Sequence, residues 1–138
     1  MFEANSFGRT LDLLHRNMDV TMLRRSVISN NIANADTPNF KRSTINFESE
    51  LKKALDSEKP RRFQAALTNE KHIAFDKTVD YRTVKPKKVL DYLTTADNNG
   101  NNVDIEEEMM LELENQMRYE IMVRSMSNQF TQISTILR

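Results

Sequence analysis

The sequence lacks cysteine, an excess of charge of either sign and any long apolar run. The absence of cysteine excludes disulfides, thiolate chemistry and cysteine-ligated metal sites. Twenty basic residues balance twenty acidic ones, so no net field draws the chain to nucleic acid or to an anionic membrane surface. No run of about 18 apolar residues occurs, so membrane insertion is not expected. With 38% hydrophobic residues and a mean hydropathy of −0.64, the 138 residues offer little material for a core.

Patterns typical of catalysis or ligand binding are also missing. The only histidines, His15 and His72, are far apart and not at metal-ligand spacing, so we expect no metal site. Glycine-rich phosphate loops, nucleophile elbows and Ser/His/Asp series do not occur. The basic runs at 59–62 and 85–88 lie among acidic residues, which favours linker or strand-edge protection over phosphate binding. We therefore expect no enzyme, no cofactor, no small-molecule substrate and no nucleic-acid partner.

Glycine is scarce too, and both glycines stand near the outer ends of strongly helical segments. Gly8 precedes a segment through Ala33 whose apolar residues recur at helical spacing, which predicts a long amphipathic helix of roughly 39 Å. Gly100 lies in the amide-rich run NNGNN, residues 98–102, which has no packing pattern and predicts a turn or loop. The residues that mark the first helix are Phe7, Leu11, Leu14, Met18, Met22, Ile28 and Ile32.

A second long helix is predicted from Asp104 to Leu137. Asp104 is suited to the N-cap position, and Glu107 completes a capping-box spacing. The run Glu106 to Glu108 favours a solvated helix start beside the positive end of the dipole, rather than a cation site or general-acid chemistry. Nothing interrupts the helix for roughly 50 Å.

The middle of the chain, residues 44–97, is less regular. Phe47, Leu51 and Leu55 recur every four residues, which predicts a short helix, and the β-branched and aromatic content of residues 72–85 predicts one or two short strands. The predicted fold is mainly α, with two long terminal helices packed as an antiparallel coiled-coil-like hairpin and a small irregular or β middle segment. The expected divisions are 1–43, 44–97 and 98–138, with the two terminal helices forming one domain.

Both long helices carry apolar residues on two faces. On the second helix, the Met110 stripe consists of Met110, Leu113, Met117 and Ile121, and the Phe130 stripe, roughly 160° away, consists of Tyr119, Val123, Met126, Phe130, Ile133 and Leu137. A helix that is apolar around much of its girth needs several neighbours. We expect other subunits to supply this cover, although the middle segment is an alternative. The residues assigned to subunit packing are Leu13, Val20, Leu23, Val27, Val123, Met126, Phe130, Ile133 and Leu137.

The first helix ends in the run NNIANADTPNFKRS, residues 30–43. Thr37 precedes Pro38 and is therefore pushed out of the α region, so the helix has to end near Ala33 or Asn34. Asn34, Asp36 and Asn39 are suited to capping backbone groups or to left-handed conformations. The run predicts a shaped turn at the exit of the helix.

This run resembles the N-terminal signature of the bacterial flagellar axial proteins, the family of rod, hook and hook-associated proteins. Residues 100–138, with Gly-Asn-x-Val-Asp before the helix and Glu-Asn-Gln-x-Arg-Tyr within it, are similar to the C-terminal region of the same family. The resemblance covers both termini, about half of the chain. The N-terminal match comprises Asn31, Asn34, Asp36, Thr37, Pro38 and Phe40. The C-terminal match comprises Glu114, Asn115, Arg118 and Tyr119.

The resemblance implies a structural subunit of the flagellar basal body, assembled helically into the proximal rod that transmits motor torque to the hook. Its implied partners are copies of itself, other rod proteins and the export gate or a basal adaptor protein. Family members are exported without a cleaved signal peptide to the periplasmic rod, which agrees with the start MFEANSFGRT. The N-terminal residues would shape the turn, with Phe40, in place of the usual tyrosine, as an anchor. The alternative is a self-contained helical binding module, such as a flagellar export chaperone or adaptor.

Overall fold

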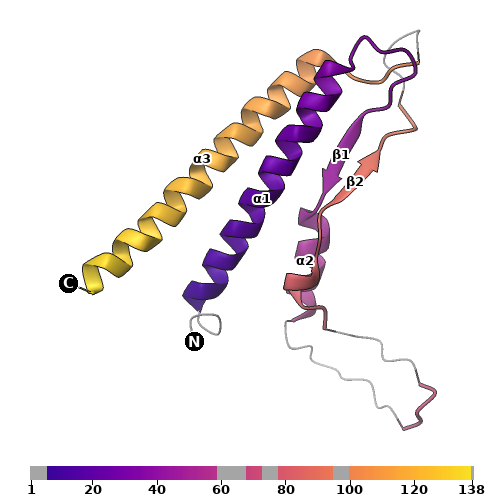
Figure 1. Cartoon of the computed structure of the whole chain (residues 1–138). Helices are drawn as coiled ribbons and strands as arrows, with labels where there is room; N and C mark the ends of the chain where they lie inside the picture. The colour runs from indigo at the N-terminus through magenta and orange to yellow at the C-terminus, as the bar shows by residue number, and fades with distance from the viewer. Residues whose placement is uncertain (1–5, 59–67, 73–77, 95–99, 138) are drawn as a thin grey trace. The chain divides into compact units, whose positions relative to one another are not determined.

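The computed structural model describes residues 6–58, 68–72, 78–94 and 100–137 (Figure 1). Its elements in chain order are α1 (Ser6–Ala33), β1 (Ser43–Asn46), α2 (Glu48–Ser57), the 3-10 turn η2 (Tyr81–Thr83), β2 (Lys87–Leu90) and α3 (Ile105–Ile136). The chain divides into two units, one formed by Met1–Ile45 with Lys88–Arg138 and the other by Asn46–Lys87.

In the first unit, α1 and α3 lie side by side as an antiparallel pair (Figure 1). Asn31, near the end of α1, bonds Glu108 at the start of α3, whereas Thr21 in the middle of α1 bonds Asn115 further along α3. The predicted mainly helical fold with a hairpin of terminal helices is therefore confirmed.

The helix boundaries follow the sequence signals. α1 ends at Ala33, as the Thr-Pro step predicts. The carboxylate of Asp104 accepts hydrogen bonds from the backbone N–H groups of Glu106 and Glu107, at 2.9 and 3.3 Å, and so caps α3 as expected.

The core of the first unit is small. Val20, Val27 and Ile28 are its buried apolar residues in α1, whereas the buried residues of α3 are the polar Glu108 and Asn115. A face that buries a carboxylate and an amide offers little apolar area to stabilise the pair. The shortage of apolar residues in the sequence is thus visible in the helix pair itself.

The second unit contains the predicted short helix, α2, which buries Leu51 and Ala54. The strands predicted within residues 72–85 are not found where expected. Residues 73–77 lie outside the described residues, and Tyr81–Thr83 forms η2. The reason is local, because the carboxylate of Asp80 accepts from Arg82 N at 2.9 Å and thereby favours a turn over an extended chain. The strand β2 begins later, and it pairs with β1.

Candidate assembly site

The turn after α1 is built by successive backbone hydrogen bonds. Asn34 N donates to Asn31 O at 3.1 Å, and Thr37 N donates to Asn34 O at 3.0 Å. Asn39 follows with a φ of 61°, the left-handed conformation predicted as an option for this residue. Phe40 N then donates to Thr37 O at 3.2 Å. The chain thereby reverses within a few residues.

Asn101, from the other end of the chain, holds this turn in place. Its amide nitrogen lies 3.0 Å from Asn34 O, 2.6 Å from Ala35 O and 3.0 Å from Thr37 O, and donates to these carbonyls. Its Oδ1 accepts from Val103 N at 2.8 Å. The side chain is fully buried. One amide therefore contacts three carbonyls of the turn after α1, of which Asn34 O and Thr37 O also accept backbone N–H groups.

Glycine is needed at position 100, where the chain before α3 meets the turn after α1. Its φ is +79°, and a Cβ added there would lie 2.8 Å from Asn39 Oδ1. Lys41 Nζ donates to Gly100 O at 2.8 Å. Of the turn or loop predicted at residues 98–102, residues 98 and 99 lie outside the described residues, while Asn101 and Asn102 are buried although the sequence there has no packing pattern. Only the long-range carbonyl partners make burial of these amides favourable.

A second contact joins α1, β1 and α3 through Asn31. Its Nδ2 donates to Ser43 O at 2.9 Å and to Glu108 Oε2 at 3.1 Å, while its Oδ1 accepts from Ser43 N at 3.1 Å. Asn31 is buried with 1% of its surface exposed. The first residue of the N-terminal signature therefore ties the end of α1 to the start of α3.

Arg42 completes this network. Its Nε donates to Glu108 Oε1, and its Nη2 lies 3.1 Å from Glu107 Oε1. Burial of Arg42 lowers its pKa, but the hydrogen bond and charge of Glu108, with those of Glu107, outweigh this and hold the pKa above its ordinary value. The guanidinium is therefore charged at every working pH.

The expectation of a solvated start for α3 is wrong for Glu108. Its side chain is 1% exposed, and both of its oxygens have partners in other elements. Consecutive helical residues point in different directions, as the sequence argument assumed, but one of the three points inward. No pattern within the acidic run distinguishes this residue, because its partners lie more than 60 positions away.

The remaining residues of the N-terminal signature are more accessible. Asp36, Thr37 and Pro38 are exposed, and Phe40 is half-buried. Asn34 donates through its Nδ2 to Asn30 O at 2.8 Å. The backbone of the turn is thus bound inside the chain, while several of its side chains face outward.

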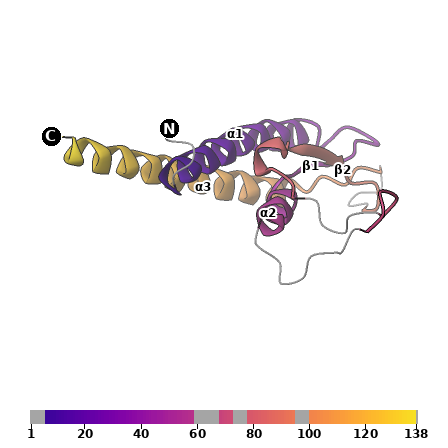
Figure 2. The ribbon, with the colours of Figure 1, turned by 90° about the horizontal axis from the view of Figure 1, so that it is seen from below.

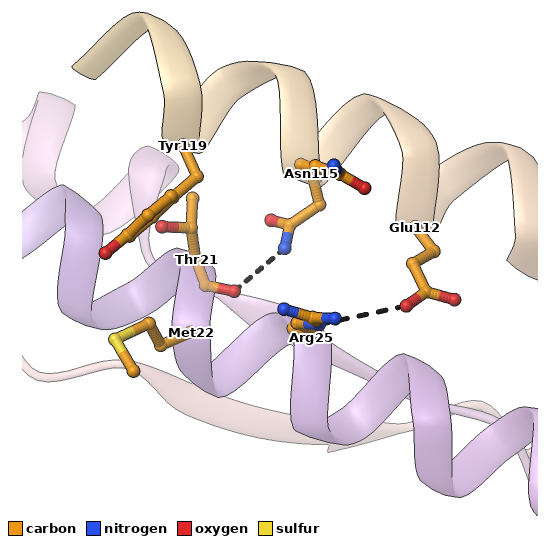
Figure 3. A pocket seen from close by; sticks show the side chains of 7 residues that line it. Thr21, Met22, Arg25, Glu112, Asn115 and Tyr119 are labelled. Atoms are coloured by element: carbon orange, nitrogen blue, oxygen red, sulfur yellow. Dashed lines mark hydrogen bonds and ion pairs between the residues drawn. The ribbon is translucent and has the colours of Figure 1, made fainter. Parts of the chain in front are cut away.

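The C-terminal signature separates into an outer pair and an inner pair. Arg118 Nη2 lies 2.6 Å from Glu114 Oε1 on the exposed side of α3. Asn115 points to α1, where its Nδ2 donates to Thr21 O at 2.8 Å (Figure 3). Tyr119 lies one turn further along α3 and lines the same cavity as Asn115 and Thr21. Asn115 thus sets the register of the two helices, a role that a buried amide also has in coiled coils.

The structure corrects part of the subunit-packing assignment. Val20 and Val27 are buried within the chain and are not available to a neighbour, whereas Leu13 is half-buried and Leu23 is exposed. In the Phe130 stripe, Met126 and Ile133 are half-buried, and Val123, Met126 and Phe130 line an open cavity of about 540 Å³ with Met18 of α1. Leu137 is 80% exposed. The Phe130 stripe therefore lies largely on the side of α3 that faces α1.

The opposite side of α3 is exposed along the whole Met110 stripe, whereas the Phe130 stripe is exposed only in part, with Val123 at 41% and Phe130 at 56%. The four residues of the Met110 stripe are between 56% and 73% exposed. The contact between Asn115 and Thr21 fixes which side of α3 faces α1, and this rotation leaves the Met110 stripe outside. Sequence periodicity finds both stripes but does not say which of them faces α1.

Known proteins resemble this chain both in the turn after α1 and over nearly its whole length. Residues 23–41, which include the turn, match the family described as flagella basal body rod protein. Over 97% of its length the chain is 47% identical to the flagellar basal body rod protein FlgB of Borreliella burgdorferi, of which 99% is covered. The chain belongs to the FlgB family of flagellar basal body rod proteins. FlgB of Borrelia hermsii is 42% identical over 97% of this chain and 99% of that protein, and FlgB of Bacillus subtilis is 33% identical over 95% of each.

Membership in the FlgB family gives the site its context. The chain has the role of a structural subunit of the flagellar basal body rod, which assembles with other rod components. Among the described residues, no group of three or more acidic or histidine side chains is placed to hold a metal ion. None of the helices in the described ranges is both long enough and apolar enough to cross a membrane.

Proposed function

We propose that this FlgB-family protein is a subunit of the proximal rod, the part of the drive shaft that transmits motor torque to the hook, and that it assembles there helically. Its partners are copies of itself, other rod proteins and, at the base, the export gate or an adaptor protein. It reaches the periplasmic rod by export without a cleaved signal peptide, and it is not an enzyme. Near full-length similarity to FlgB proteins supports this proposal.

The observation that carries the assembly role is the exposed Met110 stripe. Leu113 is 59% exposed and Met117 is 56% exposed, on successive turns of one helix. Apolar surface left in water forgoes about 25 cal/mol per Å², so a whole stripe represents a loss on the order of several kcal/mol. A neighbouring subunit that covers the stripe recovers this free energy. We therefore reassign the principal subunit contact of α3 from the Phe130 stripe to the Met110 stripe.

The two signatures then have distinct parts in the proposal. The terminal segments act as one structural domain, because Asn101, just before α3, bonds the turn at residues 34–40 and Glu108 of α3 bonds Asn31 near the end of α1. Within the turn, the outward-facing Pro38 and the half-buried Phe40 are available to a neighbour. The contacts of Asn101 and Glu108 hold the fold of the subunit, and the exposed residues contact neighbouring subunits.

Substitution of Met117 by aspartate tests the proposal. In a strain without its own copy of the gene, Met117→Asp should give soluble protein of unchanged helical content, because the side chain contacts mainly solvent. Rod assembly and motility should be lost, because the charge would be buried between subunits. Ser29→Asp, which adds the same charge at an exposed polar position of α1 outside both stripes, is the control and should preserve motility. Loss of soluble Met117→Asp protein would show instead that the stripe is covered within the chain.

A further inference from the structure

Among the described residues, the side-chain amide of Asn115 has a partner for its nitrogen but none for its oxygen. Its Nδ2 donates to Thr21 O at 2.8 Å, whereas its Oδ1 is buried and has no donor among the described residues. The residue as a whole is 5% exposed. Buried polar atoms in folded proteins are nearly always paired, so an orphan oxygen points to a donor that the isolated chain does not supply.

Asn115 is one of the residues that line a groove between α1 and α3 (Figure 3). The groove has a volume of about 210 Å³, several times the roughly 30 Å³ that one water molecule occupies in the liquid. Its walls are formed by Thr21, Met22, Arg25, Glu112, Gln116 and Tyr119. Space of this size admits a side chain with an aliphatic stem as well as a polar tip.

The charges at the groove select a neutral donor. Arg25 and Glu112 face each other with 3.8 Å between Nε and Oε1, so their charges largely compensate. A cationic tip would meet Arg25 and Glu112 alike and gain no net attraction, and an ionised carboxylate has no proton to give to Asn115 Oδ1 at neutral pH. A hydroxyl or a carboxamide satisfies the oxygen without adding charge. The groove therefore suits a side chain such as glutamine.

The end of α3 offers such side chains on every copy of the chain. The α3 tail, residues 125–137, contains no charged residue, although 29% of the chain is charged. Gln132 is exposed there, and Ile136 on the following turn is 82% exposed. Figure 2 shows the last part of α3 extending beyond the start of α1, whereas Met126 and Phe130, earlier in the tail, line a cavity with Met18 of α1. An uncharged segment loses little solvation energy when it enters a groove with largely apolar walls.

We propose that the α3 tail of one copy docks in the Asn115 groove of the next copy, with the carboxamide of Gln132 donating to Asn115 Oδ1. The inference rests on the proposed function, because it names a contact within the assembly. The two surfaces are different, so the contact is heterologous and repeats along a filament instead of closing in a dimer. Gln116 at the groove and Gln132 lie sixteen positions apart, so successive copies would be displaced by about 24 Å along parallel helices.

Because the chain has no cysteine, the contact can be tested by site-specific cross-linking. Gln116→Cys and Gln132→Cys are made as separate single variants and expressed together in the bacterium that carries this gene, after deletion of the chromosomal copy. Oxidation of the assembled rods should give a disulfide-linked species of twice 16.1 kDa. The matched control pairs Glu114→Cys with Gln132→Cys, since Glu114 is also exposed on α3 but does not line the groove. The groove pair should cross-link at least tenfold more than the control pair.

The outcomes separate the inference from the proposed function. Restored motility with selective cross-linking of the groove pair supports both. Restored motility with no cross-link, or with equal cross-linking of the two pairs, overturns the docking of the α3 tail and leaves the rod role intact. Failure of the unmodified chain to restore motility in the same strain would contradict the rod role itself, and the inference with it.

Discussion

Arg42 and Glu108, 66 positions apart in the chain, form an ion pair in which the carboxylate is 1% exposed and the guanidinium 16% exposed. The pair joins the segment after α1 to the first turn of α3, and Asn31 bonds the second oxygen of the same carboxylate. The N-terminal and C-terminal segments therefore depend on each other for their structure where these three residues meet. The segments that resemble the flagellar axial family most closely, at the two ends of the chain, meet at these contacts. These contacts are therefore the first to test.

Removal of the charge on Glu108 should destabilise the first unit strongly. Glu108→Ala leaves Arg42 largely buried without its main partner, and we expect a loss of about 3 kcal/mol in the free energy of unfolding. Urea unfolding followed by circular dichroism measures the change. Glu106→Ala, at an exposed position of the same turn, is the control and should change stability by less than about 0.5 kcal/mol. Equal effects of the two substitutions would show that the ion pair contributes little.

Asn101→Ala should release the turn after α1. The substitution leaves the carbonyls of Asn34, Ala35 and Thr37 without the amide donor, and we expect a loss of about 2 to 3 kcal/mol. Hydrogen exchange should locate the change in residues 34–40. Asn128→Ala in the exposed part of α3 is the control, because alanine there slightly favours the helix. A fully protected turn in Asn101→Ala would contradict the role given to the amide.

The two glycines should respond to alanine with opposite signs. Gly100→Ala places a Cβ 2.8 Å from Asn39 Oδ1 at a φ of +79°, so we expect destabilisation by about 1 to 2 kcal/mol. Gly8→Ala, inside α1, should stabilise the helix by up to about 1 kcal/mol. Thermal unfolding of both variants beside the parent chain gives the comparison. An unchanged melting temperature in Gly100→Ala would mean that the loop relaxes without cost.

Asp91 should give a pH dependence on the acid side. The hydrogen bond from Thr94 Oγ1, and then that from Leu93 N–H, lower the pKa of Asp91 below its ordinary value of 3.8. A lowered pKa in the folded state means that the ionised group stabilises the fold above pH 3.8 and that this contribution is lost as the pH falls through the folded value. Thr94→Val removes the largest cause and should raise the pKa of Asp91. An NMR titration of the carboxyl carbon checks this, and an unchanged titration in Thr94→Val would contradict the assignment.

Local signals explain why much of the helical framework is predictable. The step from Thr37 to Pro38 ends α1, and Asp104 begins α3, because steric exclusion and capping act between residues only a few positions apart. The periodicity of apolar residues likewise reveals helices and the existence of two stripes. The structure of residues 72–85 is less predictable from the sequence, because side-chain capping by Asp80 outweighs the β propensity of its neighbours.

The sequence by itself determined the two long helices, their ends, the shortage of core residues and the family to which the chain belongs. The tertiary structure alone decided that Glu108 and Asn101 are buried, and that the Met110 stripe is turned away from α1. The physical reason is the range of the interactions. Helix formation and capping depend on neighbours within about one turn, whereas the burial of a carboxylate or an amide depends on partners such as Arg42 and Ala35, which lie about 66 positions away.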